Sequence, residues 1–350
     1  MACSIGWHGC CAPAISNPLP DQLSVADSRL DEFARIARFF APLAGSGALG
    51  LLDDAALVEV PTGRQLVLTA DALVAGVHFL TDDPPDLVAR KMLRVNLSDL
   101  AAMGAAPLGY LMTTALPAAC DEVWLAGFAS GLAADQAAFG IALLGGDSVA
   151  TPGPPTLSVT AIGSVPAGQA VRRSGALPGD LIYVSGTIGD AALGLRALRG
   201  ELAELDAAQY AFLADRYRLP QPRLALGQRL VGVAHAMLDV SDGLVGDLNH
   251  LCAVSGVGAV LEAARVPQSP AVREALARDP ALLALVLGGG DDYELVFSAP
   301  SAAEGALAAL ATSLALPITA IGRIEAGDGV RVIDETGRKI ALAAPGYRHF

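Results

Sequence analysis

Residues 95–104 read Val-Asn-Leu-Ser-Asp-Leu-Ala-Ala-Met-Gly and close a pattern that predicts a helix over residues 85–103. Apolar side chains recur along this helix at steps of three and four, which places them on one face. Asp99 falls on the same face, one turn after Val95. Burying a carboxylate costs several kcal/mol unless a partner compensates its charge, and no basic residue lies one turn away. A metal ion is one such partner; the alternative is that Asp99 caps a neighbouring backbone turn.

Two further aspartates flank predicted strands in the first part of the chain. Residues 55–60 and 66–69 are apolar runs separated by Pro-Thr-Gly, which predicts a hairpin of two short strands. Asp54 opens the first strand, and the second strand runs into Asp71. Side chains at the ends of elements commonly meet in a shared cleft. Both aspartates are therefore candidate ligands, although Asp is also a common cap and turn residue.

The same placement recurs later in the chain. Asp147 comes after the Gly-Gly pair that follows a strand predicted over residues 141–144. Asp239 lies late in a strand predicted over residues 236–240, and Asp242 precedes the next predicted helix, whose dipole it can also stabilise. Magnesium prefers carboxylate and water oxygens and is usually bound by one or two carboxylates together with substrate phosphates. The set therefore predicts a site for several magnesium ions that hold a polyphosphate.

Other residues suit phosphoryl transfer, which depends on charge neutralisation and in-line positioning more than on covalent help. Arg173 offers a bidentate donor for phosphate oxygens. Glycines at residues 145–146 and 288–290 let the backbone approach a ligand closely. His78 and Asp291 are candidates for facing the acceptor. The alternative for His78 is an ordinary surface or core histidine.

Hydrophobic periodicity divides the chain into two α/β halves. We predict a disordered extension over residues 1–26, an N-terminal domain over residues 27–165 and a C-terminal domain over residues 166–350. The predicted fold class is α/β (α+β), with a mixed sheet and helices in the first domain and an α/β second domain. Further strands are predicted over residues 108–115, 157–165, 181–185, 258–261 and 293–298, and further helices over residues 27–40, 121–139, 190–199, 207–217 and 223–233.

Composition restricts the classes of partner. Of the 350 residues 53% are hydrophobic, but no run reaches the roughly 18 apolar residues that a membrane-spanning helix needs. The net charge of −13 argues against nucleic acid, whose phosphates need a basic surface. The start of the chain has neither a signal-peptide nor a transit-peptide pattern. The five cysteines form no CxxC pair, so we expect no disulfide framework and a location in the reducing cytoplasm.

Residues 45–50 spell G-x-G-x-x-G, the fingerprint of dinucleotide-binding folds. That fingerprint binds a pyrophosphate when it follows a strand and opens a helix. Here it follows a predicted helix and leads into an acidic pair, so we expect a flexible turn. The sequence also has no Walker A loop and no kinase-type catalytic loop. If the protein uses ATP, it binds it on another scaffold.

A series of motifs occurs in a fixed order from about residue 27 to the end of the chain. They are Leu-Thr-Ala-Asp (68–71), Gly-Val-His-Phe (76–79), residues 95–104, Gly-Gly-Asp (145–147), Arg-Ser-Gly (173–175), Pro-Gly-Asp (178–180), Asp-Val-Ser-Asp-Gly-Leu (239–244), Gly-Gly-Asp-Asp-Tyr-Glu-Leu (289–295) and Gly-Tyr-Arg-His-Phe (346–350). The series resembles the thiamine-monophosphate kinase family, within the aminoimidazole ribonucleotide synthetase-like superfamily. The resemblance implies the two-domain fold of that superfamily.

The resemblance also implies an activity and a set of site residues. The activity is direct in-line transfer of a phosphoryl group from ATP to thiamine phosphate, with several Mg²⁺ ions and a homodimer built through the N-terminal domain. Carried over by position, the magnesium ligands would be Asp54, Thr69, Asp71, Asp99, Asp147, Asp239 and Asp242. ATP would contact Gly146, Asp147, Arg173 and Ser241, and thiamine phosphate would contact His78, Asp291 and Tyr347.

Three positions depart from the family pattern. Leu52 stands where the family has a glycine, Ala70 where it usually has Ser or Thr, and Asp291 where it usually has Glu. These changes affect the local backbone, remove a hydroxyl group and shorten an acid by one methylene. None of them removes a carboxylate.

Two other classes of protein compete with this interpretation. One is a different enzyme of the superfamily, such as the cyclo-ligase or a selenophosphate synthetase, which would carry a reactive cysteine beside a glycine-rich N-terminal loop. No such pairing follows residue 26. The other is a non-catalytic acidic protein that binds cations. It would need neither Arg173 nor the glycine-rich segments.

Overall fold

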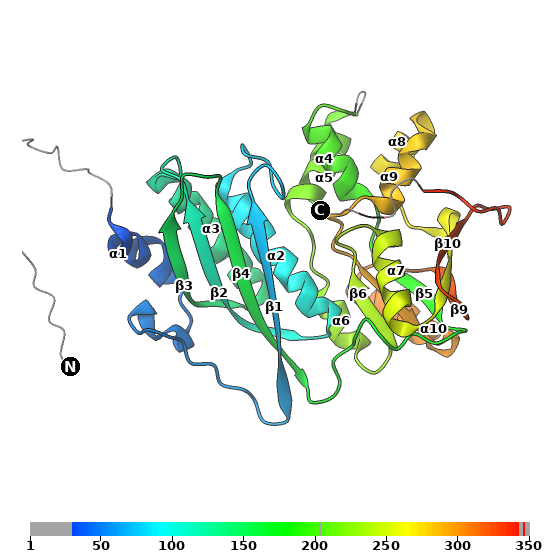
Figure 1. Ribbon diagram of the computed structural model, residues 1–350, viewed down its shortest axis with the longest axis horizontal. Coiled ribbons are helices and arrows are strands. Elements are labelled where there is room, and N and C mark those ends of the chain that lie inside the picture. The colour runs from blue at the N-terminus through cyan, green and yellow to red at the C-terminus, as the bar shows by residue number, and fades with distance from the viewer. Residues whose placement is uncertain (1–29, 203–204, 343–345, 347–350) are drawn as a thin grey trace, which may run out of the picture.

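The computed structural model describes residues 30–202, 205–342 and 346, and within them two sheets with their helices form two α/β domains. The domains lie side by side along the long axis of the molecule, with the N-terminal domain on the left of Figure 1. This arrangement confirms the predicted fold class of a mixed sheet with helices followed by a second α/β domain. The predicted extension over residues 1–26 lies outside the described residues.

The N-terminal sheet has four strands in the order β1-β4-β2-β3. β4 is antiparallel to both β1 and β2, whereas β2 and β3 are parallel. β1 and β3 are therefore the two edges of this sheet. The strands span Arg64–Val74 (β1), Ala106–Leu116 (β2), Ala142–Ala150 (β3) and Thr156–Pro166 (β4).

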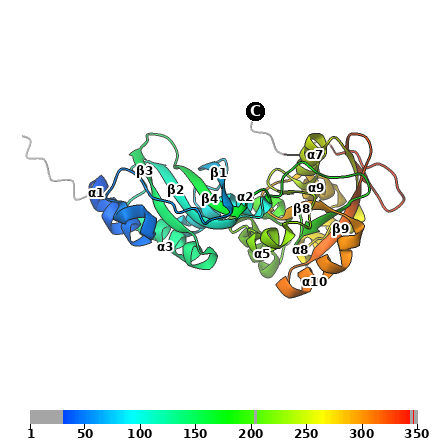
Figure 2. The ribbon, with the colours of Figure 1, turned by 90° about the horizontal axis from the view of Figure 1, so that it is seen from below.

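Helices α2 (Pro85–Ala102) and α3 (Glu122–Phe139) pack against one face of this sheet and against each other (Figure 2). Pro85 starts α2, where the missing N–H costs no hydrogen bond. Asp121 caps α3 by accepting hydrogen bonds from two backbone N–H groups of its first turn. α2 also contacts β6, α5 and α6 of the C-terminal domain, which explains why most of it is buried.

The opposite face of the N-terminal sheet carries exposed apolar side chains. Leu68 on β1, Leu111 on β2 and Val149 on β3 are 61%, 39% and 46% exposed. The strand registers place these residues on one face, because alternate residues of a strand point to the same side. Apolar patches of this kind commonly mark interaction surfaces.

The C-terminal sheet has six strands in the order β10-β7-β9-β5-β8-β6, of which β10 and β7 are parallel and the other neighbours antiparallel. The strands span Leu181–Ser185 (β5), Ala236–Asp239 (β6), Gly258–Glu262 (β7), Leu295–Ala299 (β8), Ile318–Glu325 (β9) and Gly329–Ile333 (β10). The helices of this domain span Asp190–Leu198 (α4), Ala207–Arg218 (α5), Leu224–Leu230 (α6), Leu244–Ser255 (α7), Pro270–Arg278 (α8), Leu283–Gly288 (α9) and Glu304–Leu314 (α10).

The predicted hairpin before α2 was wrong. Residues 55–60 are described and form no strand, and β1 pairs with β4 instead. Asp54 therefore lies in a bend and opens no strand. β1 also continues through Asp71 to Val74, so this acid lies within the strand rather than after its end.

The strand predicted over residues 141–144 was too short. β3 runs through Gly145, Gly146 and Asp147 to Ala150, so the Gly-Gly pair makes no turn. A Cβ atom on Gly146 would lie 1.7 Å from the carbonyl oxygen of Met112 on β2. The glycine is needed because the two strands approach closely there, and Asp147 is part of the strand.

Other segments differ in type from the prediction. The described part of the helix predicted over residues 27–40 is α1 (Glu32–Arg35) followed by a π-helical turn, Ile36–Phe40. The glycine-rich residues 45–50 fall mostly in a 3₁₀ segment, Ser46–Leu51. Helices α8, α9 and α10 and strands β9 and β10 were not predicted. Among the described helices, none combines the length and apolar character required to cross a membrane.

Candidate active site

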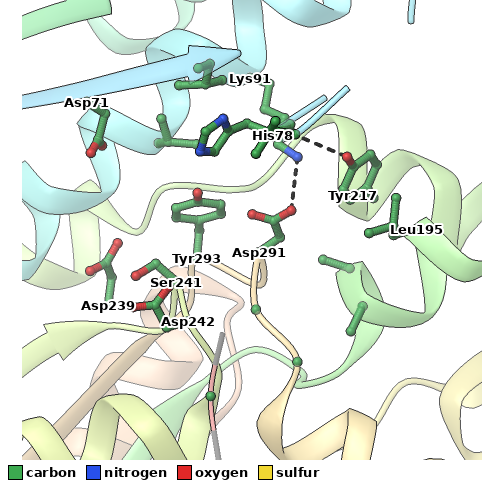
Figure 3. A pocket seen from close by; sticks show the side chains of 18 of the residues that line it. Asp71, His78, Lys91, Leu195, Tyr217, Asp239, Ser241, Asp242, Asp291 and Tyr293 are labelled. Carbon is green, nitrogen blue, oxygen red and sulfur yellow. Dashed lines mark hydrogen bonds and ion pairs between the residues drawn. The ribbon is translucent and has the colours of Figure 1, made fainter. Parts of the chain in front are cut away.

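A cleft of about 810 Å³ lies between the two domains. β1 and α2 supply residues on its N-terminal side, and the loop after β6 and the segment before β8 supply residues on its C-terminal side. In Figure 3, Asp71, Asp239 and Asp242 lie on one side of the cleft. Lys91, Asp291 and Tyr217 lie on the other side, and the ring of His78 lies between the two groups. We name the two ends by their residues: the carboxylate end (Asp71, Asp99, Asp239 and Asp242) and the lysine end (His78, Lys91, Tyr217 and Asp291).

Three acids of the carboxylate end come from separate elements: Asp71 from β1, Asp99 from α2 and Asp239 from β6. Burial raises the pKa of Asp71 to about 6, and the charge of Asp99 adds to the rise. Burial also raises the pKa of Asp99. The pKa of Asp239 rises to about 8, first through burial and then through the charge of Asp99. These acids lie close enough to disfavour one another's ionisation.

Hydroxyl groups hold two of these acids. Thr69 Oγ1 donates a hydrogen bond to Asp99 Oδ2 at 2.5 Å. Ser98 Oγ donates one to Asp239 Oδ2 at 2.7 Å, and both partners of that bond are buried. Ser98 and Asp99 are consecutive residues of α2, yet Ser98 bonds to the C-terminal domain and Asp99 to the N-terminal sheet. Two neighbouring residues therefore connect the domains at the cleft.

The donor set of the carboxylate end fits magnesium. Carboxylate and hydroxyl oxygens are the ligands that Mg²⁺ prefers, and it commonly completes its octahedron with water and substrate phosphates. Among the residues that the structure describes, no three Asp, Glu, His or Cys side chains are gathered as a ready-made metal site. The raised pKa values of Asp71 and Asp239 show that their negative charges lack full compensation. A bound divalent cation would supply that compensation.

Arg173, Ser241 and Asp242 also line the cleft at this end. Arg173 is exposed, and its positive charge opposes the rise in pKa of the nearby buried acids. The loop that carries Ser241 and Asp242 is fixed by Asp247, whose Oδ2 accepts hydrogen bonds of 3.0 Å from the N–H groups of Asp242 and Gly243. Asp242 is therefore free of the capping role, and its side chain borders the cleft.

The lysine end is held by contacts between three elements. Lys91 Nζ, from α2, lies 3.1 Å from Asp291 Oδ2 and 3.6 Å from the centre of the Tyr217 ring (Figure 3). The Tyr217 hydroxyl, from α5, donates a 3.4 Å hydrogen bond to the backbone oxygen of His78. His78 Nδ1 in turn accepts a 3.0 Å hydrogen bond from Val74 N, which orients the imidazole.

The segment before β8 alternates between the cleft and the interior. Asp291 and Tyr293 have left-handed backbones, with φ of 72° and 51°, and both line the cleft. Such conformations cost on the order of 1–2 kcal/mol in a residue other than glycine. Asp292 and Glu294 are buried; Asp292 accepts hydrogen bonds from two N–H groups at the start of α4, and Glu294 accepts hydrogen bonds from a serine and two arginines. These buried bonds hold the strained segment in place.

A second pocket contains the remaining predicted residues. Asp54, Gly146 and Asp147 line a pocket of about 540 Å³ beside β3, at the edge of the sheet opposite to β1. The structure thus divides the predicted set between two places. In the cleft lie Asp71, His78, Asp99, Arg173, Asp239, Ser241, Asp242 and Asp291, with Thr69 bonded to Asp99. Tyr347 lies outside the described residues.

The three departures from the family pattern lie in different surroundings. Leu52 is 90% exposed and has a φ of −109°, which any residue adopts, whereas the neighbouring Leu51 is left-handed with a φ of 58°. Ala70 is exposed on the open face of β1. Asp291 forms an ion pair with Lys91, so this side chain reaches a partner although it is one methylene shorter than the usual Glu.

Sequence reasoning missed three residues that shape the cleft. Lys91 precedes Asp99 by eight residues, and with Val95 it follows the same face of α2, so the helical spacing could have revealed it. Ser98 carried no separate signal, because a serine within a buried helix is common. Tyr217 lies on a helix 126 positions after Lys91, and only the tertiary fold brings the two together.

Comparisons with known proteins show which sequences and folds this chain resembles. The family models for the AIR synthase related protein match residues 52–165 (N-terminal domain) and 178–335 (C-terminal domain). Thiamine-monophosphate kinase of Caulobacter vibrioides is 42% identical over 323 residues, covering 91% of this chain and 90% of the relative. The crystal structure of thiamine-monophosphate kinase from Stenotrophomonas maltophilia K279a is 48% identical with a TM-score of 0.75, covering 81% of this chain and 89% of that one. The complex of AaThiL with AMPPCP and TMP is 31% identical with a TM-score of 0.74, covering 87% and 97%.

Proposed function

The chain belongs to the thiamine-monophosphate kinase family, and on that premise we propose that it transfers a phosphoryl group from ATP to thiamine phosphate, giving ADP and thiamine diphosphate. The observation that carries the proposal is the division of one cleft into an acidic end and an end with Lys91 and Asp291. The first suits metal-bound phosphates and the second suits an acceptor with its own charged and polar groups. A related structure holds an ATP analogue and TMP together.

We propose that Asp71, Asp99 and Asp239 hold magnesium together with the phosphates, with Asp242 and the Thr69 hydroxyl beside them. Bound magnesium would neutralise phosphate charge and keep the reacting groups in line. The raised pKa values of these acids support the assignment, because an unpaired buried carboxylate is costly and a cation removes that cost.

The remaining cleft residues position the two substrates. Arg173 is exposed at the acidic end, where its guanidinium suits phosphate oxygens of ATP, and Ser241 offers a hydroxyl beside it. His78 and Asp291 face the cleft at the other end and are proposed to contact thiamine phosphate, as is Tyr347. An oxygen of the acceptor phosphate then attacks the γ-phosphorus directly, and no side chain needs to carry the phosphoryl group. The chain supplies alignment and charge.

We further propose a homodimer formed through the N-terminal domain, in which the second pocket of one copy would contribute to the active site of the other. The open face of the N-terminal sheet presents Leu68, Leu111 and Val149, and a second copy would cover these apolar side chains. In such a dimer, Asp54, Gly146 and Asp147 of one copy would complete the cleft of the other.

We also propose a domain boundary near residue 166 and a cytoplasmic location. A division near residue 166 is supported by the end of β4 at Pro166 and the start of β5 at Leu181. A cytoplasmic location is supported by Cys120 and Cys252, which are both buried and unpaired and so suit a reducing compartment.

A coupled assay of ADP release tests the function. Purified protein is given ATP and Mg²⁺ with thiamine phosphate, thiamine or an unrelated phosphate ester as acceptor, and the product is identified by chromatography. Of the three acceptors, we expect only thiamine phosphate to be turned over, and we expect no turnover without Mg²⁺. Phosphorylation of thiamine itself would overturn the assignment. Calorimetry with a non-hydrolysable ATP analogue excludes a simple cation-binding protein if Mg²⁺ binds more tightly in its presence.

A further inference from the structure

Lys91 is a buried ammonium at the lysine end of the cleft. Its side chain is 3% exposed, although it borders the cavity. The ammonium contacts Asp291 Oδ2 at 3.1 Å and stands 3.6 Å above the Tyr217 ring. A cation over an aromatic face is stabilised by the ring quadrupole, most strongly where water is excluded. The two contacts fix the ammonium from two sides.

The choice of lysine at this position is unusual for this chain. Of its 23 basic residues only two are lysines, Lys91 and Lys339, and the rest are arginines. The described buried ion pairs of the interior are made by arginine, as between Arg94 and Asp135 and between Arg216 and Glu294. The chain thus keeps a lysine at one buried, cavity-lining position.

A compact ammonium has a geometric advantage here. The planar guanidinium of arginine donates from a rigid fork and stacks flat on aromatic rings. Lysine instead presents a point charge that can sit over the Tyr217 ring and still reach Asp291. A guanidinium in the same space would be larger, and it would pair with both carboxylate oxygens instead of one.

The pairing with one oxygen matters because Asp291 faces the acceptor side of the cleft. Its backbone is left-handed, with a φ of 72°, and its N–H donates a 2.8 Å hydrogen bond to the Ser241 carbonyl oxygen. Lys91 occupies Oδ2. In Figure 3 the other carboxylate oxygen points toward the middle of the cleft. The carboxylate is therefore oriented, with one oxygen available to a ligand.

We propose that Lys91 is a positioning residue that determines acceptor specificity, because it holds Asp291 so that the second carboxylate oxygen accepts an N–H from the amino group of the acceptor's heteroaromatic ring. This inference rests on the proposed function, since thiamine phosphate supplies the aminopyrimidine. An oriented carboxylate oxygen favours an acceptor that carries this amino group, because an acceptor without it leaves the buried oxygen unpaired. Lys91 acts through Asp291 and takes no part in the phosphoryl transfer itself.

The experiment compares K91M with K339M, which removes the other, exposed lysine as a matched control. Each protein is assayed with thiamine phosphate and with an analogue that carries hydrogen in place of the pyrimidine amino group. We expect wild type and K339M to prefer thiamine phosphate by roughly tenfold or more in kcat/KM, as a hydrogen bond to a charged group provides. In K91M the preference should fall to about threefold or less, with KM for ATP changed by less than about twofold.

The outcomes separate this inference from the proposed function. If wild type does not phosphorylate thiamine phosphate, the function itself is wrong. If wild type is active and K91M keeps the full preference for the amino group, the role of Lys91 is wrong. A purely structural role would lower kcat with both acceptors equally and leave their ratio intact, which also overturns the inference. Should K91M not fold, K91R is measured instead, and an unchanged ratio in K91R has the same meaning.

Discussion

Asp71 on β1 and Asp147 on β3 lie at opposite edges of one four-stranded sheet, with β4 and β2 between them. Neighbouring strands are about 4.8 Å apart, so the two edges of the sheet are separated by about 14 Å. Magnesium–oxygen bonds are only about 2.1 Å long. One ion therefore cannot bind both carboxylates of the same chain, whereas in the proposed dimer Asp147 of one copy would complete the cleft that holds Asp71 of the other.

Mixed dimers test this relationship. D71N and D147N are each expected to lose activity, because each disables a proposed metal ligand at both sites. Coexpression of the two variants with different tags yields mixed dimers in which one site has lost both acids and the other is intact. Activity of the mixture should recover to about a quarter of wild type, since half the dimers are mixed and each carries one working site of two. A mixture that stays inactive while its dimers form would show that Asp71 of one copy and Asp147 of the other do not share a site.

Asp99→Asn should abolish turnover without weakening the metal-free protein. Burial raises the pKa of Asp99, so its charge is a cost to the folded state until a cation is bound. The amide still accepts the hydrogen bond from Thr69. We expect kcat to fall on the order of a hundredfold or more, with a melting temperature in EDTA equal to or above that of wild type. D328N, at an exposed aspartate, is the control. A clear loss of stability in EDTA would instead favour a structural role.

Asp292→Asn should flatten the pH dependence of stability. Burial raises the pKa of Asp292 to about 8, against the hydrogen bonds from Gly189 and Ala191 that lower it. Between its ordinary value near 3.8 and about 8, the folded protein keeps this proton and the unfolded chain has lost it. Stability therefore falls as pH rises through this window. The free energy of unfolding, measured with urea at pH 5, 6, 7 and 8, should decline less with rising pH in the variant than in wild type. Equal slopes would mean that Asp292 does not titrate as inferred.

Gly290→Ala should damage the cleft through the backbone. A Cβ atom at Gly290 would lie 2.1 Å from the carbonyl oxygen of Ser241, which also accepts the N–H of Asp291. Relieving this overlap must separate the two loops, at a cost on the order of 1–3 kcal/mol. We expect a lower melting temperature and a higher KM for thiamine phosphate. G305A, which lies in α10 with nothing within 4 Å, should leave the KM unchanged and keep or slightly raise the melting temperature, because alanine favours a helix more than glycine does. An unchanged KM for thiamine phosphate in G290A would show that separating these loops does not affect acceptor binding.

The sequence predicted α2 well because a helix repeats its pattern locally. Residues 85–103 were predicted, the helix spans Pro85–Ala102, and Asp99 lies on the face that borders the cleft. The edges of strands were harder to predict. The Gly-Gly pair before Asp147 has the composition of a turn, but Gly146 is a glycine because Met112 of the next strand leaves no room for a Cβ atom. Only the neighbouring strand reveals that reason.

The grouping of the acids also depends on nonlocal structure. Asp71 and Asp147 have the same local signal, an acid near the end of an apolar run, and the strand order alone places them apart. Lys91 carries a local signal, since it shares a helix face with Asp99, but its partners Asp291 and Tyr217 come from the other domain. Motifs can therefore list the participants, whereas the tertiary fold determines which of them meet.

The hydrogen bonds of the consecutive residues Ser98 and Asp99 link the two sides of the cleft through α2. One residue bonds to Asp239 of the C-terminal domain and the next to Thr69 of the N-terminal sheet. Asp99 and the partner of Asp239 are therefore one peptide unit apart, and that unit is planar and rigid. A shift of α2 would therefore move the carboxylates of both domains together, so this helix couples the two sides of the cleft.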